Sequence, residues 1–388
     1  MDINKQQNLL ITCAREIAPY LQKEVKDLGF QVKSQHRTGI EISASLVEAM
    51  KLNFCLRNAF NVLCLLKQFS CRHAQDLYKH VSSIAWEDIV EPSEYISVVS
   101  RVDSPTINNS VFVSQKAKDA IVDRIAEKCN MRPSAGGNRD NVVVNLYWKD
   151  EKCWIYLNTS GRKLSDRNYR KIPYKAPLQE TLAAALLQAA NYDGLQTLVN
   201  PMCGSGTIAI EAALVALNRP AASLRSNFGF MHIKGFDLEL WNALRKQLST
   251  LSKKKPSFRI IASDIDKHAI ELAKKNAQNA GVDHCIEFYV CDFKDTPIPE
   301  EKGIIVFNPE YGQRLGIQKQ LENTYKEMGD FLKQKCSGFT GYVFTGNQAL
   351  AKFIGLRANR RLLFFNAKIE CRLLEYLLYS GTKRLSFR

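Results

Sequence analysis

Helices and short apolar strands alternate through the C-terminal half of the chain, and this alternation constrains the fold more than any other feature. From residue 176 onward, helical patterns such as "TIAIEAALVALN" and "DKHAIELAKKNAQNAG" separate the apolar runs "LQTLVN", "FRIIASD", "IEFYVCD", "GIIVFN" and "GYVFTGN". Strands that alternate with helices predict an α/β fold with a doubly wound, mostly parallel sheet. The last runs, in "LLFFNAKIECRLLEYLLYS", have no helix between them and predict an antiparallel edge strand.

A glycine loop lies between the first of these strands and a helix. In "LVNPMCGSGTIAIEAAL", Gly204, Ser205 and Gly206 precede the helix. Glycine lets the backbone approach a ligand, and the N-terminus of a helix favours a phosphate or carboxylate, so the loop predicts a nucleotide-type cofactor. Thr207 and Ile208 follow where a phosphate-binding loop needs lysine, and the third glycine of a dinucleotide fingerprint is missing.

Acidic residues follow the next two strands. Asp264 ends "IIASD" and could either bind ribose hydroxyls or be the N-cap of the helix that begins near Lys267. Asp266 suits the N-cap better, so Asp264 is expected to bind the ribose. A long insertion, residues 219–258, separates Asp264 from the glycine loop. Asp292 follows the third strand and would accept from an adenine amine with Phe293 packing on the ring, or it is a solvated loop residue. A cofactor with a carboxylate, a ribose and an adenine is S-adenosylmethionine.

The segment "VFNPEYGQRLG" follows the fourth strand. Asn308-Pro309 is an ordinary turn signal at a strand end. The segment also resembles the Asn-Pro-Pro-Tyr tetrapeptide that grips an amino group in one class of methyltransferases, with Glu310 in place of the second proline. Ligands of such sheets bind beyond the carboxyl ends of the strands, so features at four successive strand ends predict one site.

The N-terminal half has a different pattern. Residues 1–60 read as strand, helix, two strands, and a helix that runs into a strand. Residues 70–160 read as helix, strand, helix, and a strand hairpin across Lys149–Lys152. These patterns predict small α+β layers.

Positive charge is concentrated just after this half. The chain has 54 Lys and Arg against 39 Asp and Glu, a net charge of +15. Residues 161–175, "GRKLSDRNYRKIPYK", hold six basic residues and one acidic residue, a net of +5 and so a third of the excess. Concentrated charge interleaved with Tyr169 and Tyr174 favours a nucleic-acid partner over a solvated surface.

Other compositional features predict absences. The 11 cysteines form no Cys-x-x-Cys pair and the six histidines form no helical ligand pair, so we expect reduced thiols and no metal. No apolar run approaches the roughly 18 residues of a membrane span, and the N-terminus has no signal-peptide pattern. These features predict a cytoplasmic protein without a membrane partner. They leave the oligomeric state open.

Together these segments resemble THUMP-domain class I RNA methyltransferases, specifically the bacterial 23S rRNA guanine-N2 methyltransferase group. The resemblance rests on "NPMCGSGTIAIEAAL" and "NPEYGQRLG", and extends to "TCAREIAPYLQKEVKDLG", "VSQKAKDAIVDRIAEKCNMRPS" and "SGRKLSDRNYR". It implies a ferredoxin-like domain at 1–68, a THUMP RNA-binding domain at 69–160, a basic connector at 161–175 and a class I Rossmann-like methyltransferase domain at 176–388.

The resemblance also implies the reaction and its residues. A methyl group would pass from S-adenosylmethionine to the exocyclic amine of a guanine flipped out of 23S rRNA. The methionine end of the cofactor would be lined by Asn200, Pro201, Cys203, Gly204, Ser205, Gly206 and Thr207, the ribose bound by Asp264, and the adenine by Asp292 and Phe293. Asn308, Pro309 and Tyr311 would hold the base, and Arg162, Lys163, Arg167, Arg170 and Lys171 would contact RNA.

Two residues depart from the family pattern. Asn200 stands where the family usually has aspartate, and Glu310 where it has proline, which suggests a compensating exchange of negative charge or an inactive relative. The alternatives are a tRNA guanine-N2 methyltransferase, a protein-glutamine methyltransferase, which the basic connector argues against, and a non-catalytic RNA-binding or ribosome assembly factor that retains the fold.

Overall fold

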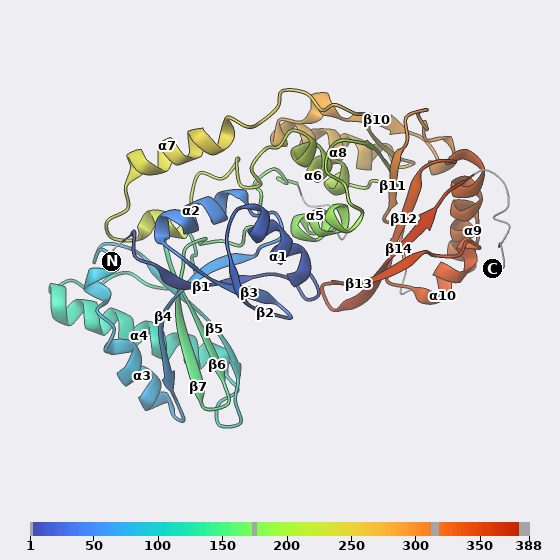
Figure 1. Ribbon diagram of the computed structural model, residues 1–388. Coiled ribbons are helices and arrows are strands. Elements are labelled where there is room, and N and C mark those ends of the chain that lie inside the picture. Colours follow the sequence, from blue (N-terminus) through green and yellow to red (C-terminus); the bar gives the residue numbers. More distant parts are fainter. Residues whose placement is uncertain (1–2, 173–176, 312–317, 380–388) are drawn as a thin grey trace. The chain divides into compact units, whose positions relative to one another are not determined.

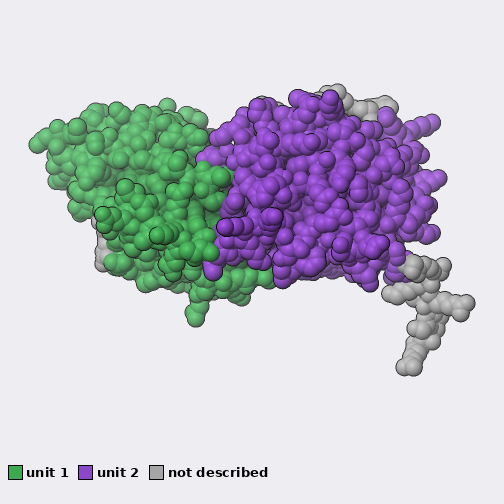
Figure 2. Space-filling model, turned by 90° about the horizontal axis from the view of Figure 1, so that it is seen from above, with its two compact units in different colours: residues 1–14, 21–166, 220–250 green, residues 15–20, 167–219, 251–388 purple. Residues whose placement is uncertain are grey.

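A computed structural model describes residues 3–172, 177–311 and 318–379 (Figure 1). Residues 173–175 of the predicted connector and 312–316 of the "VFNPEYGQRLG" segment lie outside these ranges. The chain divides into two compact units, coloured green and purple in Figure 2. Unit 1 comprises Met1–Ala14, Leu21–Asp166 and Pro220–Thr250, and unit 2 comprises Arg15–Tyr20, Arg167–Arg219 and Leu251–Arg388. No helix within the described ranges combines the length and apolar character needed to span a membrane.

Unit 1 is built on a seven-stranded sheet of order β2-β3-β1-β4-β7-β6-β5. All neighbouring strands are antiparallel except β5 and β6, which run parallel. The strands are β1 (Gln7–Thr12), β2 (Val32–His36), β3 (Gly39–Ala44), β4 (Asn61–Ser70), β5 (Ile96–Asp103), β6 (Val142–Lys149) and β7 (Lys152–Asn158). The helices are α1 (Ala18–Asp27), whose first residues are assigned to unit 2, α2 (Leu46–Cys55), α3 (Ala74–Ser82) and α4 (Ser110–Cys129).

Strand β4 belongs to both predicted N-terminal domains. Its residues 61–64 pair with β1 of the ferredoxin-like part, and its residues 63–70 pair with β7 of the THUMP part. The expected boundary between residues 68 and 69 therefore falls inside a strand. The two α+β patterns form one continuous sheet.

The insertion between the glycine loop and Asp264 packs within unit 1. It contains α7 (Leu238–Ser249), and its aromatic rings surround the buried Trp241. Phe54 of α2 lies 5.5 Å from Trp241 between ring centroids, and Phe230 lies 5.0 Å away. Apolar contact thus joins the segment Pro220–Thr250 to unit 1.

Unit 2 has a second seven-stranded sheet, of order β10-β9-β8-β11-β12-β14-β13. The strands β8 to β12 are parallel, as the sequence predicts, and β14 is antiparallel to both its neighbours. The antiparallel strand is therefore one position inside the sheet, and β13 forms the edge, because the hairpin inserts its second strand beside β12. The strands are β8 (Thr197–Pro201), β9 (Ile260–Asp264), β10 (Glu287–Val290), β11 (Gly303–Phe307), β12 (Thr340–Thr345), β13 (Arg360–Asn366) and β14 (Ile369–Leu377).

Helices cover this sheet and bury its apolar strands. The helices are α5 (Glu180–Ala189), α6 (Thr207–Ala216), α8 (Lys267–Ala280), α9 (Gln318–Lys335) and α10 (Gln348–Ala351). α6 packs on β8 and β9, and α8 packs on β9 and β10. A core cluster joins Tyr325, Met328 and Phe331 of α9 to Ile305 and Phe307 of β11. The predicted α/β class I fold, preceded by α+β domains, is confirmed.

Candidate functional site

The predicted site segments meet at one edge of the second sheet. The strands β10, β9, β8 and β11 are neighbours in that order and run parallel. They end at Val290, Asp264, Pro201 and Phe307. Because parallel strands bring their carboxyl ends to the same edge, the glycine loop, Asp264, Asp292 and the Asn308 segment converge there.

Gly206 fixes the turn from β8 into α6. Its φ of +81° lies in the left-handed region, and a Cβ added to it would lie 2.9 Å from the Cβ of Ala273 in α8. The Gly206 N–H donates to the Cys203 carbonyl at 3.0 Å, and the Cys203 N–H donates to the Ser263 carbonyl at 2.9 Å. The loop thus lies against α8 and β9 and begins α6 at the edge of the sheet. The N-terminus of a helix there favours an anionic group.

The other loop side chains have different surroundings. The Thr207 hydroxyl accepts a hydrogen bond from Nη2 of Arg170 at 2.9 Å, so it is already engaged by the connector. Desolvation raises the pKa of the Cys203 thiol well above its ordinary value. Burial of this kind favours the thiol over the thiolate, which is the reactive form of cysteine. Ser205 is buried, and its carbonyl accepts from the Asn276 amide at 3.2 Å.

Asp264 holds the glycine loop as well as the end of β9. Its Oδ2 accepts from the Gly204 N–H at 2.9 Å, and its Oδ1 accepts from the Asp266 N–H at 3.0 Å. Asp266 caps α8 by accepting from the His268 N–H at 2.9 Å, which confirms the predicted N-cap. A carboxylate oxygen has a second lone pair, so Asp264 still has capacity for ligand hydroxyls.

The third strand end places Asp292 at the edge and Phe293 in the core. Oδ1 of Asp292 accepts from the Lys294 N–H at 2.9 Å, and its Oδ2 lies 3.6 Å from the Lys294 ammonium. Phe293 is only 6% exposed, and its ring lies 5.9 Å from the rings of Phe307 and Phe331. The ring is thus part of the core of the sheet, which does not fit its expected place against an adenine.

Asn200 connects two strands beneath the site. It is fully buried, and its Nδ2 donates to the Val306 carbonyl at 2.8 Å. Its Oδ1 has no hydrogen-bond partner among the described residues. Only the Nδ2 of the amide can donate to that carbonyl, so this contact fixes the orientation of the Asn200 side chain. An aspartate at position 200 would have no N–H to donate. Glu310 is exposed to solvent, so the exchange of negative charge between positions 200 and 310 finds no support in their surroundings.

The Asn308 segment offers acceptors at the end of β11. Oδ1 of Asn308 is buried and has no partner within the part of the chain that the structure describes. The Glu310 carbonyl accepts from the hydroxyl of Tyr325 in α9 at 3.4 Å. The same hydroxyl lies 2.8 Å from the Thr345 hydroxyl at the end of β12.

Tyr311 is fixed by residues that the sequence did not point to. Its phenol oxygen accepts from Nδ2 of Asn366 at 2.7 Å, and its ring lies beside Gly346, where an added Cβ would be 2.9 Å from Cδ2. Burial raises the pKa of Tyr311. Tyr325 has the helical spacing of a core residue, and Asn366 has the pattern of a hairpin turn, so neither pattern indicated these contacts.

The basic residues that were predicted to contact RNA divide into exposed and buried groups. Arg162 and Lys163 belong to unit 1 and Lys171 to unit 2, and all three are exposed. Arg167 is 1% exposed and lies 3.6 Å from Glu211 of α6. Arg170 is mostly buried beside Glu180 at 3.2 Å. The buried carboxylates of α5 and α6 require positive partners, so Arg167 and Arg170 are corrected from RNA contacts to internal ion pairs.

Tyr169 is also internal. It is fully buried, and its hydroxyl donates to Oε1 of Glu211 at 3.2 Å. Tyr169 is interleaved with the basic residues in the sequence, but its ring does not lie on the surface with them.

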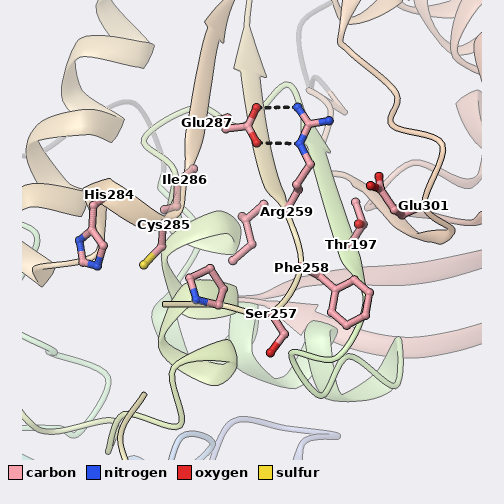
Figure 3. Close-up of a pocket in the computed structure, with 11 residues that line it drawn as sticks. Thr197, Ser257, Phe258, Arg259, His284, Cys285, Ile286, Glu287 and Glu301 are labelled. Carbon is pink, nitrogen blue, oxygen red and sulfur yellow. Dashed lines mark hydrogen bonds and ion pairs between the residues drawn. The ribbon is translucent and has the colours of Figure 1, made fainter. Parts of the chain in front are cut away.

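A separate cavity of about 510 Å³ lies at the opposite edge of the same sheet (Figure 3). Thr197, Ile260 and Glu287, which begin β8, β9 and β10, contribute to its lining. Arg259 makes two hydrogen bonds of 2.7 Å to the Glu287 carboxylate there, as the dashed lines mark. Because these are the amino ends of the strands, the cavity is distinct from the predicted site.

The described residues offer no set of ligands for a metal ion. They contain no group of three or more His, Cys, Asp or Glu side chains arranged to hold an ion.

Comparison with known proteins assigns the parts of the chain. Residues 167–375 match the RMKL-like methyltransferase domain, residues 71–158 the THUMP domain and residues 8–63 the RlmL ferredoxin-like domain. The chain is 37% identical over 94% of its length to ribosomal RNA large subunit methyltransferase K/L of Psychromonas ingrahamii, but spans only 49% of that protein. It therefore spans about half the length of the K/L relatives it matches.

Two further relatives are matched over nearly their whole length. The chain is 32% identical over 95% of its length to the Synechocystis protein named "Putative RNA methyltransferase slr0064", of which it covers 96%. The crystal structure of SMU.472 complexed with SAH has a TM-score of 0.88, with 23% identity over 97% of this chain and all of that one. The chain therefore belongs to the RMKL-like methyltransferase family, in the form that carries RlmL ferredoxin-like and THUMP domains.

Proposed function

We propose that this protein transfers a methyl group from S-adenosylmethionine to the exocyclic N2 amine of a guanine in 23S rRNA. The observation that carries the proposal is the buried Oδ1 of Asn308, which has no partner among the described residues. A buried acceptor without a donor is costly, and an amine bound at this position would satisfy it.

The chemistry requires positioning more than a strong base. The lone pair of an exocyclic amine is delocalised into the purine ring, so the amine is a weak nucleophile. Asn308 Oδ1 and the Pro309 carbonyl would accept its two hydrogens and Tyr311 would stack on the base, which would orient the lone pair for transfer. The N–C bond forms as the S–C bond of the donor breaks, and the amine gives up one proton to water. Alignment of this kind supplies most of the acceleration in reactions limited by geometry.

The neighbouring strand ends would hold the cofactor. The turn at Gly206 presents the start of α6 to the methionine carboxylate, and Asp264 accepts from the ribose hydroxyls. Asn200 Oδ1, buried and without a described partner, accepts from the methionine ammonium, and Asp292 accepts from the adenine amine. The chemistry that S-adenosylmethionine supplies is an electrophilic methyl group. The fold is that of SMU.472, whose crystal structure contains SAH.

RNA binds through the THUMP part and the exposed basic residues of the connector. Among the connector residues that the structure describes, Arg162, Lys163 and Lys171 are exposed to solvent. Ribosomal RNA is favoured over tRNA because the K/L relatives are named for the large ribosomal subunit. A guanine within a duplex has to leave its stack to reach the Asn308 segment.

The test is methyl transfer from labelled S-adenosylmethionine to RNA from cells that lack this protein. We expect label in 23S rRNA at guanine N2, and Asn308→Ala is expected to lower turnover about 100-fold because the amine is no longer positioned. Asn242→Ala, on the exposed face of α7, is the matched control. Label in tRNA or protein instead of rRNA would reassign the substrate. Cofactor binding without transfer to any fraction would favour a non-catalytic assembly factor.

A further inference from the structure

Asn366 lies on the hairpin that ends the second sheet, yet its side chain reaches a segment 55 residues earlier. It is the last residue of β13 and pairs with Ile369 of β14 across the turn. Asparagine is common in turns, where its side chain usually bonds to the local backbone. Here Nδ2 donates instead to the phenol oxygen of Tyr311 at 2.7 Å. The turn itself does not require this contact, because any residue can fill the last ladder position.

One edge of the Tyr311 ring lies beside Gly346, just after β12. A Cβ at Gly346 would lie 2.9 Å from Cδ2 and 3.0 Å from Cε2 of Tyr311, and 2.9 Å from Cγ2 of Ile369. Real Cβ atoms do not come so close, so the ring lies directly against the backbone. Gly346 does not have a positive φ, which makes the requirement for glycine steric and not conformational.

The carbonyl just before Tyr311 is held as well. Tyr325 donates to the Glu310 carbonyl at 3.4 Å, and its hydroxyl is anchored by Thr345 at 2.8 Å. Tyr325 is fully buried in the core of α9, which ties this contact to the packed interior. Three elements (α9, the end of β12 and the β13–β14 hairpin) therefore meet around residues 310 and 311.

We infer that Asn366 is a positioning residue for methyl transfer, because its amide and the Gly346 backbone together set the plane of the Tyr311 ring. The inference rests on the proposed function, in which Tyr311 stacks on the target base. A ring held by a hydrogen bond at its phenol oxygen and by backbone along one edge loses less freedom when the base arrives. Asn366 touches neither substrate, and acts through Tyr311.

The side-chain chemistry separates this role from simple packing. Asn366→Leu keeps a similar volume and removes the donor. Asn366→Asp removes the donor too, but its carboxylate accepts from the Tyr311 hydroxyl, which restores a hydrogen bond with the direction reversed. Burial raises the pKa of Tyr311, so its hydroxyl carries the proton that this reversal needs.

The experiment measures kcat and KM on 23S rRNA with S-adenosylmethionine. Asn366→Leu is expected to lower kcat about 10-fold, the effect of removing one hydrogen bond, and Asn366→Asp to return it to within about threefold. The Kd for S-adenosylhomocysteine should stay at the wild-type value, because the side chain of Asn366 bonds to Tyr311 at the end of β11 and the glycine loop follows β8. The stoichiometry of S-adenosylhomocysteine binding gives the fraction of each variant that is folded. Dividing kcat by this fraction separates a folding defect from a defect in positioning.

Two further variants make the result decisive. In a Tyr311→Phe background, Asn366→Leu should have no additional effect, because the acceptor is already gone. Gly346→Ala leaves Asn366 intact, displaces the ring from its other side and should also lower kcat. Asn242→Ala, on the exposed face of α7, is its control.

The outcomes distinguish this inference from the proposed function. Wild-type kcat in Asn366→Leu, or a decrease that persists in full in the Tyr311→Phe background, overturns the role of Asn366 alone. A wild-type chain that methylates no guanine in RNA overturns the proposed function, and the inference with it.

Discussion

Arg167 and Glu211 form an ion pair inside the methyltransferase unit, with 3.6 Å between Nε and Oε1. Their side chains are 1% and 0% exposed, and the Tyr169 hydroxyl donates to the same carboxylate. The connector arginine thus stabilises α6, the helix that begins at the glycine loop.

Arg167→Ala is expected to lower the free energy of unfolding by about 3–5 kcal/mol, because Glu211 remains as a buried charge without its partner. Denaturant unfolding followed by circular dichroism measures the change. Arg162→Ala is the matched control. Its ion pair with Asp140 is 56% and 38% exposed, so we expect a decrease of about 0–1 kcal/mol. Equal decreases in the two variants would contradict the internal role of Arg167.

Gly206→Ala is expected to destabilise the methyltransferase unit by about 1–2 kcal/mol, because the left-handed conformation strains a residue with a Cβ. The added methyl group also meets Ala273, so the loop should shift and the Kd for S-adenosylhomocysteine should rise. Isothermal titration measures that Kd. A variant with unchanged affinity would show that the loop does not form the cofactor site.

Asn200→Asp is expected to lower stability at pH 7 and to do so less at pH 5. Burial beside the Val306 carbonyl raises the folded-state pKa of the introduced carboxyl above its unfolded value of about 3.9, so the penalty grows as pH rises between the two values. Thermal unfolding at both pH values measures it, with Asn242→Asp on the exposed face of α7 as control. Added S-adenosylhomocysteine should narrow the difference, because its ammonium would compensate the charge. A pH-independent decrease would contradict this account.

Glu310→Pro is expected to leave the Kd for S-adenosylhomocysteine within about twofold of wild type, because an exposed carboxylate is screened by water. Glu310→Ala separates the removal of charge from the effect of the proline ring. Equal weakening in both variants would revive the idea that Glu310 compensates for Asn200.

Substitution of Lys163 or Lys171 by alanine is expected to weaken RNA binding and to reduce the slope of log K against log salt by about 1 for each lysine that pairs with a phosphate. Filter binding at several salt concentrations gives the slope. Lys246→Ala, on the exposed face of α7, is the control. An unchanged slope in both variants would remove the connector from the RNA-binding surface.

The strand ends were predictable because each closes a short apolar run, and a parallel sheet brings such ends together. The count of charges located the basic residues in the connector, but it could not predict which of their side chains point outward. Arg167 points inward because Glu211, 44 residues later, is buried on α6. That pairing depends on tertiary packing, which no local pattern contains.

Other differences have the same origin. The position of β14 inside the sheet depends on which strand of the hairpin pairs with β12, and this pairing is long-range. The insertion joins unit 1 through Phe230 and Trp241, whose partner Phe54 is far away in sequence. The sequence around Asn366 indicated only a turn. Its hydrogen bond to Tyr311 forms only when the sheet brings the two residues together, so no local pattern predicts it.

The sharing of β4 has a consequence for how the N-terminal half unfolds. A cut between residues 68 and 69 would sever a strand whose N–H and C=O groups bond to β1 on one side and β7 on the other. Each fragment would expose an unpaired strand at the edge of its sheet, which is a template for aggregation. The ferredoxin-like and THUMP parts are therefore expected to melt as one cooperative unit, and expression of either part alone should give insoluble protein.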